Sequence, residues 1–284
     1  STNARSSNDL FFRKQTFDFS LYPQIPFPRL LDVRAANTKA AHLRGSFPNY
    51  DCYGFNAIAA MNTNNAETWS FWLNCTNPND QNFIFVDSLD AYVKLEPGTV
   101  PGVEANSLTF VAYHTTGLNG TWNTDAAVTA GNEWVHIAIT YDGSSTSNDP
   151  VIYVNGESVA ITEYIAPVGT REPYNGPITI GWDTSHGFEG DISDVAFYNT
   201  VLTGEAIKDI YGNATLDLKD HGPIQVASNL IFWWRMGNGA GDTDALIYDQ
   251  MGNQNLAAIN SPNLVDITAA DCFRATAPAG PLSA

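Results

Sequence analysis

Short apolar and alternating runs dominate the chain from about residue 68 onwards, and they predict β-strands. The runs cover 68–73, 82–87, 107–113, 133–143, 177–182 and 191–199. The run 133–143 has the strongest signal, because apolar side chains occupy every second position from Val135 to Tyr141. Segment 150–162 predicts a hairpin, since Asn155-Gly156 supplies the positive φ angles of a type I′ turn.

A single short helix interrupts the strand pattern. Thr203 can cap it, Glu205 stands in the first turn where the helix dipole favours an anion, and Gly212 marks its end. A further strand is expected at 229–236. Many short strands with one peripheral helix indicate an all-β protein, and two stacked sheets would each bury one face.

The first 45 residues have a different character. Pro23, Pro26 and Pro28 remove amide donors and hold the chain extended, although a short helix near 30–39 is an alternative for its last part. The predicted organisation is an extended arm over 1–45, a sandwich over 46–268 with the strand 229–236 late in its order, and a C-terminal strap over 269–284.

Charge divides the chain in the same place. Seven basic and three acidic residues stand up to Arg44, whereas the remainder holds six basic and 27 acidic ones. An acidic body disfavours nucleic acid and anionic membranes as partners. The arm could dock on an acidic surface or remain a solvated tail. Its candidate docking residues are Arg13, Lys14, Phe17, Phe19, Arg29 and Arg34.

The cysteines and the N-terminus add little chemistry. Cys52, Cys75 and Cys272 are too few and too widely spaced for a disulfide framework, so we expect buried free thiols, with a Cys52–Cys75 bridge as the alternative. The N-terminal residues carry no apolar signal core, and Ser1 could follow removal of Met or a processing cut. No apolar run approaches the length of a membrane span.

Three segments resemble known sandwich domains. WVHIAITYDGSS…PVIYVNGESV (134–159) resembles the central hairpin of laminin G-like and concanavalin A-like domains, and 187–213 resembles their closing strand and short helix. The segment 229–255 resembles the text that normally opens such a domain. The resemblance implies a concanavalin A-like jelly-roll sandwich with one short peripheral helix and an extended N-terminal arm.

The late position of the opening-like segment has three explanations. They are a circular permutation, a truncated second copy, and a C-terminal strand that completes the same sheet; the first and the third are favoured, because the end strands of such sandwiches lie side by side. The Trp-Trp-Arg-Met-Gly text at 233–237 also resembles virion proteins of tailed, particularly marine, bacteriophages.

Because the resembling superfamily contains glucanases, catalysis must be considered. Such enzymes carry paired acids on one strand, and the nearest text here is Glu189-Gly190-Asp191-Ile192-Ser193-Asp194. Its spacing would place Asp191 and Asp194 on opposite faces of a strand, so we predict no catalytic residues and no enzymatic activity. No cofactor is expected; calcium stays open as a ligand of the resembling sandwiches, and no ligand set stands out for it.

Sugar binding needs an aromatic platform with polar neighbours. The candidate residues are Trp182, Asp183, His186, Tyr174 and Trp122. The alternative for the aromatic members is burial in the core, because tryptophan is usually largely buried.

The resemblance and the charge pattern together predict a function. The favoured role is a non-enzymatic structural protein of a virion, made in the host cytoplasm, that attaches through its arm to a shell or tail protein, forms a homo-oligomer and displays a jelly roll to host glycans. The alternative is a carbohydrate-binding lectin or module, and a glycoside hydrolase is disfavoured. Fold alone decides none of these.

Overall fold

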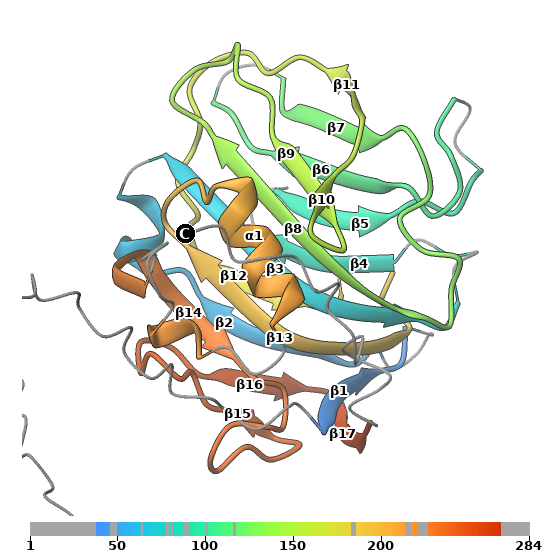
Figure 1. The fold of residues 1–284 in the computed structure, drawn as a ribbon, viewed down its shortest axis with the longest axis vertical. Coiled ribbons are helices and arrows are strands. Elements are labelled where there is room, and N and C mark those ends of the chain that lie inside the picture. Colours follow the sequence, from blue (N-terminus) through green and yellow to red (C-terminus); the bar gives the residue numbers. More distant parts are fainter. Residues whose placement is uncertain are drawn as a thin grey trace, which may run out of the picture. The chain divides into compact units, whose positions relative to one another are not determined.

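A computed structural model describes residues 38–45, 50–63, 65–77, 80, 82–87, 91–99, 102–115, 118–182, 186–213, 217–220 and 227–267 of the chain. These residues form two stacked antiparallel sheets with a short helix against one of them (Figure 1). The expectation of an all-β two-sheet sandwich with one short α-helix is confirmed for the described residues.

Sheet A follows the spatial order β10 (Glu157–Ser158), β9 (Val151–Val154), β8 (Trp134–Asp142), β3 (Ala66–Cys75), β13 (Gly190–Tyr198), β1 (Lys39–Leu43) and β17 (Asn263–Asp266), and β14 (Leu230–Trp234) also pairs with β13. Sheet B follows the order β11 (Ile161–Ile165), β7 (Gly120–Thr124), β6 (Leu108–Ala112), β5 (Tyr92–Leu95), β4 (Asn82–Asp87), β12 (Pro177–Ile180), β2 (Cys52–Asn56), β16 (Leu256–Ile259) and β15 (Leu246–Ile247). The helices are η2 (Ala59–Asn62), α1 (Gly204–Gly212), η3 (Leu218–Asp220) and η4 (Ala227–Asn229).

Local chemistry placed the main elements correctly. Asn155 and Gly156 both have positive φ, as the predicted turn between β9 and β10 requires. Helix α1 begins after Thr203, whose hydroxyl accepts from the amide of Ala206 at 3.3 Å. Strand β8 buries both faces, because one packs into the core and the other lies beneath α1.

Strand β13 is completed along one edge by two segments from opposite ends of the chain. Strand β1 pairs with Gly190–Ile192, and β14 pairs with Val195–Tyr198 (Figure 1). Both are antiparallel to β13, so they run in the same direction, one after the other. Asn238 joins them, because its Oδ1 accepts from the amides of Thr38 at 2.7 Å and Lys39 at 3.0 Å.

This arrangement explains the late opening-like segment. After β14, the chain contributes β15 and β16 to sheet B, where β16 pairs with β2. A truncated second copy is therefore excluded, because the segment completes both sheets of the same sandwich. A permutation and an added C-terminal strand both produce this pairing.

The sandwich also includes residues that the sequence analysis assigned to the arm. Strand β1 lies within 1–45, and its short, alanine-rich text KAAHL gives little strand signal by itself. The docking residues Arg13, Lys14, Phe17, Phe19, Arg29 and Arg34 lie outside the described residues, as does the strap 269–284.

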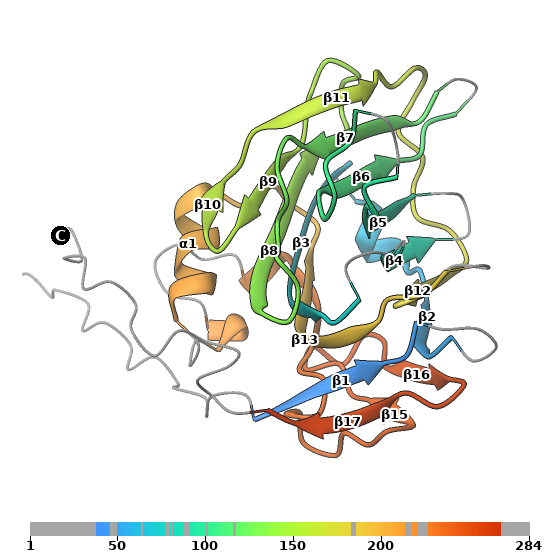
Figure 2. The ribbon, with the colours of Figure 1, turned by 90° about the vertical axis from the view of Figure 1, so that its right-hand side faces the viewer.

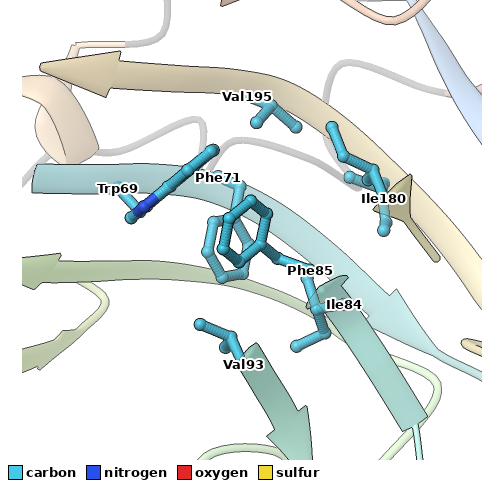
Figure 3. A pocket seen from close by; sticks show the side chains of 8 residues that line it. Trp69, Phe71, Ile84, Phe85, Val93, Ile180 and Val195 are labelled. Carbon is cyan, nitrogen blue, oxygen red and sulfur yellow. The ribbon is translucent and has the colours of Figure 1, made fainter. Parts of the chain in front are cut away.

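The space between the sheets is filled largely by aromatic rings. Trp69 lies 4.2 Å from Phe85 and 4.7 Å from Phe197 between ring centroids, and Phe232 stacks on Trp234 at 4.8 Å. Figure 3 shows an apolar cavity beside Trp69, and its volume is about 10 Å³. That volume is at the lower limit for a single water molecule, so this cavity belongs to core packing.

Cys52 and Cys75 are buried free thiols, as expected, and the alternative bridge between them is absent. Burial raises the pKa of Cys52 to about 12 and that of Cys75 to about 11. Both therefore stay protonated and unreactive at neutral pH. Cys272 lies outside the described residues.

Helix α1 covers part of the outer face of sheet A (Figure 2). His136 of β8 is fully buried in this layer, where its Nε2 lies 2.9 Å from the hydroxyl of Ser70. Burial lowers the pKa of His136 to about 4, although the nearby carboxylate of Asp194 opposes that shift. The folded protein therefore holds this imidazole neutral.

We expect His136 to make stability depend on pH between about 6.5 and 4. Within this window the unfolded chain binds a proton that the folded chain excludes, so stability falls as the pH is lowered. The loss attributable to His136 should be on the order of 3 kcal/mol across the window. Denaturant unfolding at pH 7 and pH 4.5 measures it against His136→Gln, which keeps a polar partner for Ser70 but does not titrate. Equal losses in both proteins would contradict the assignment.

Candidate functional site

Trp182 lies in the turn that links β12 to β13. The backbone closes this turn, because Trp182 pairs with Gly187 and the amide of Phe188 donates to the carbonyl of Gly181 at 2.7 Å. The Trp182 side chain is half-buried. Its indole N–H lies beneath the surface with no hydrogen-bond partner in the described part of the chain. A buried donor without a partner is costly, so a bound hydroxyl or water oxygen would stabilise it.

Tyr50 forms an aromatic pair with Trp182. Their ring centroids are 6.4 Å apart and their planes differ by 21°. Gly187 makes this packing feasible, because a Cβ there would lie 2.9 Å from the Cα of Gly45 and 3.0 Å from Cδ1 of Tyr50. The near-parallel, half-buried rings form what we call the loop aromatic pair.

Hydrogen bonds hold the segment beside Tyr50 in place. Arg44 Nε donates to the buried carboxylate of Asp51 at 2.5 Å, and the amide of Ser261 donates to the same carboxylate at 3.0 Å. Asn260 Nδ2 donates to the carbonyl of Tyr50. The pair is therefore supported by hydrogen-bonded backbone at Tyr50, which favours preorganised binding.

The polar residues predicted for this site are only partly described. His186 is half-buried in the same turn, four residues after Trp182, and is engaged in interactions of its own. Asp183 lies outside the described residues. Tyr50 was missed by sequence reasoning, because it is 132 positions from Trp182 and no local pattern links the two.

Trp122 and Tyr174 do not belong to this platform. Trp122 is fully buried, with its ring packed between Phe110 and Tyr141 and its N–H donating to Asp149 at 2.8 Å. Tyr174 is 4% exposed and lies in the core against Trp69. Neither ring offers a face to a sugar, which removes both from the candidate site.

A buried ion pair accounts for the position of Tyr174. Arg171 Nη2 lies 3.2 Å from Glu67 Oε1, and the guanidinium carbon of Arg171 lies 5.0 Å from the centre of the Tyr174 ring. Burial and the neighbouring Glu67 carboxylate raise the pKa of Tyr174 well above its usual range. These groups line a cavity of about 20 Å³, enough for one water molecule.

The expectation that Asp191 and Asp194 point to opposite faces of their strand is wrong. A β-bulge shifts the register between Ser193 and Ala196, and Asp194 adopts a φ of 55°. The bulge inserts one extra residue, so both aspartates lie on the outer face of sheet A. Strict alternation of side chains along a strand does not predict such a bulge.

Each acid of the glucanase-like text has a partner within the fold. Glu189 accepts from Asn77 Nδ2 at 3.1 Å, and Asp191 Oδ1 lies 2.7 Å from His42 Nδ1. Asp194 is 7% exposed and accepts from the indole N–H of Trp233 at 2.7 Å. These contacts give all three carboxylates structural roles, and Asp194 is too enclosed to reach a large substrate.

The described part of the chain contains no assembled set of metal ligands. No three His, Cys, Asp or Glu side chains converge there. Asp87, at the end of β4, accepts from the backbone amide of Ala91, and Asp142, at the end of β8, accepts from that of Ser144.

No described helix is long and apolar enough to span a membrane.

A family model for the concanavalin A-like lectin/glucanases superfamily matches residues 50–208. The chain belongs to this superfamily. The match includes β2 to β13 and the first part of α1. It ends before β14, the strand that follows α1 in the sequence and pairs with β13. No curated protein sequence matches the chain.

Solved structures extend the likeness to most of the sandwich. A carbohydrate-binding candidate from Bacteroides ovatus ATCC 8483 has a TM-score of 0.58 at 18% identity, covering 83% of this chain and 62% of its own. A heptameric SAP-like pentraxin from Limulus polyphemus has a TM-score of 0.49 at 12% identity, covering 80% of this chain and 98% of its own. Domain 4 of the arabinanase AbnA from Geobacillus stearothermophilus, solved with arabinotriose, has a TM-score of 0.39 at 17% identity, covering 56% of this chain and 72% of its own. At 18% identity the likeness to the Bacteroides ovatus protein shows the fold alone.

The arrangement of the acids generates a prediction about hydrolysis. The purified chain should release no reducing sugar from glucan or agar, because the partners of Glu189, Asp191 and Asp194 leave no free acid and base facing one another. A sensitive reducing-end assay measures this. Turnover that disappears in Asp191→Asn, but persists in the exposed control Asp266→Asn, would overturn it.

Proposed function

We propose that this chain is a non-enzymatic glycan-binding sandwich whose contact site is the loop aromatic pair Tyr50–Trp182. The observation that carries the proposal is a pair of half-buried, near-parallel aromatic rings at a loop edge, beside an indole N–H with no partner among the described residues. Pyranose rings present C–H faces to aromatic rings, and their hydroxyls accept and donate hydrogen bonds.

The superfamily and the fold likeness add support. The Bacteroides ovatus protein is named for carbohydrate binding, and its TM-score is the highest of the three compared above. Glu189, Asp191 and Asp194 each already contact another side chain of the fold, which favours glycan binding over hydrolysis. His186, in the same turn, would supply polar contacts to the ligand.

The test is a printed glycan array followed by titration of the best binder. Trp182→Ala should weaken binding roughly tenfold or more, because it removes one ring of the pair. The matched control is Tyr164→Ala, which removes an aromatic ring that is 58% exposed on β11, at the edge of sheet B. An array without binders, or equal affinity in both variants, would sink the proposed site.

A second candidate role is that of a structural subunit on a virus particle, made in the host cytoplasm and assembled as a homo-oligomer. The observation that favours it is the charge contrast between the basic N-terminal segment and the acidic remainder. An arm of this kind would attach electrostatically to an acidic shell or tail protein, leaving the sandwich to contact glycans.

Particle attachment is testable in the full-length chain. Replacing Arg13, Lys14, Arg29 and Arg34 by Glu should abolish co-sedimentation with purified particles, and the loss should resemble the effect of high salt on the unaltered protein. Replacing Lys208 and Lys219, which are exposed basic residues of the body, provides the control. Particles that carry none of the chain by immunogold labelling would refute this role.

A further inference from the structure

A line of four side chains crosses the outer face of sheet A. His42 of β1 pairs with Asp191 of β13, Asp191 with Asn74 of β3, and Asn74 with Trp134 of β8. Residues opposite one another on adjacent strands point to the same side of the sheet. We call these four residues the outer-face row.

The row borders the layer that α1 covers, because Trp134 and Tyr211 of α1 both pack against Trp72. Beneath the helix, Ala138 of β8 and Ala196 of β13 are fully buried. The row crosses the same strands four residues before Ala138 and five residues before Ala196, and there His42 keeps 35% of its side-chain area exposed and Asp191 keeps 18%. Asn74 and Trp134 are likewise half-buried. This part of the outer face is therefore accessible.

The row combines a fixed aromatic ring with polar groups. Trp134 packs against Trp72, whose ring stacks on Tyr211 of α1 at 5.7 Å between centroids. That contact restrains the indole and lowers the entropy that binding would cost. At the other end, His42 Nδ1 and Asp191 Oδ1 lie 2.7 Å apart, which orients both side chains.

Asn74 lies between these two ends. Its Oδ1 lies beneath the surface and has no hydrogen-bond partner among the described residues. A polar atom left in this state costs free energy that a bound donor would recover. The gap between Trp134 and Asp191 is thus the point at which a ligand would gain most.

The chemistry of the row selects a class of ligand. An aromatic face, an unpaired amide and an imidazole–carboxylate pair match a chain of hydroxyl groups with C–H faces. Three inter-strand spacings of about 4.8 Å give the row a length of roughly 14 Å, which exceeds one sugar ring. The net charge of −17 disfavours anionic polysaccharides.

We infer that the outer-face row is a second binding site, which takes a neutral oligosaccharide of at least two rings, separate from the loop aromatic pair. The inference rests on the proposed glycan-binding function, but it uses a different face of the sandwich and different residues. Trp134 stacks on one ring of the ligand, and Asn74 and Asp191 bind the hydroxyls of the next.

Calorimetric titration with neutral glucose- and galactose-based mono- and tetrasaccharides tests the row. Asn74→Ala and Trp134→Ala should each weaken tetrasaccharide binding roughly tenfold, and Trp134→Phe should restore part of the affinity. Asp191→Asn should weaken it by a similar factor, because it removes a charged acceptor. Tyr164→Ala is the control for an unrelated exposed ring, and thermal unfolding of each variant checks that the fold is intact.

The outcomes separate this inference from the proposed function. Loss of binding in Trp182→Ala, with unchanged affinity in Asn74→Ala and Trp134→Ala, would overturn the row and keep the loop site. Loss in the row variants alone would support the row and overturn the loop site. Equal affinity for monosaccharide and tetrasaccharide would overturn the extended site. A panel with no binder would overturn both, and the contact between His42 and Asp191 would then be only a structural one.

Discussion

The fold depends on how one edge of β13 is completed. Two strands share that edge, and the place where one gives way to the other is the bulge of β13 at Asp194. Strand β1 covers the part before the bulge, and β14 covers the part after it. The indole N–H of Trp233 satisfies the carboxylate of Asp194 within the bulge, and Asn238 bridges the two covering strands. These contacts connect the two ends of the sandwich sequence.

Both candidate binding surfaces depend on the way in which β1 and β14 share one edge of β13. Strand β1 brings His42 opposite Asp191, so the imidazole–carboxylate pair of the outer-face row exists only because an N-terminal strand joins sheet A. The chain after β1 passes Gly45, which approaches Gly187 closely enough to leave no room for a side chain. That approach places Tyr50 beside Trp182. Strand β1 and the chain after it therefore place His42 beside Asp191 on the outer face of sheet A, and Tyr50 beside Trp182 at the adjacent loops.

The aromatic residues of this chain serve two purposes that composition does not distinguish. Trp69, Trp122 and Trp234 are enclosed between the sheets, where each contributes on the order of 2–3 kcal/mol through burial. Trp134 and Trp182 are half-buried, at the start of β8 and in the turn after β12. These partly exposed rings are the ones that can still offer a face to a ligand, whereas the enclosed rings cannot.

Local patterns in the sequence determined the strands β3, β4, β6, β8, β12, β13 and β14, together with the Asn155-Gly156 turn and the Thr203 cap, because these depend on neighbouring residues alone. They also placed the chain in a sandwich family through segments 134–159 and 187–213. Only the tertiary structure decided that Trp122 and Tyr174 are buried while Trp182 pairs with Tyr50, since burial depends on what packs from distant strands. The same holds for Asp194, whose side of the sheet reversed because a bulge breaks the two-residue period. Strand β1 lacked a local signal altogether, and it forms because β13 and β17 supply its hydrogen-bond partners.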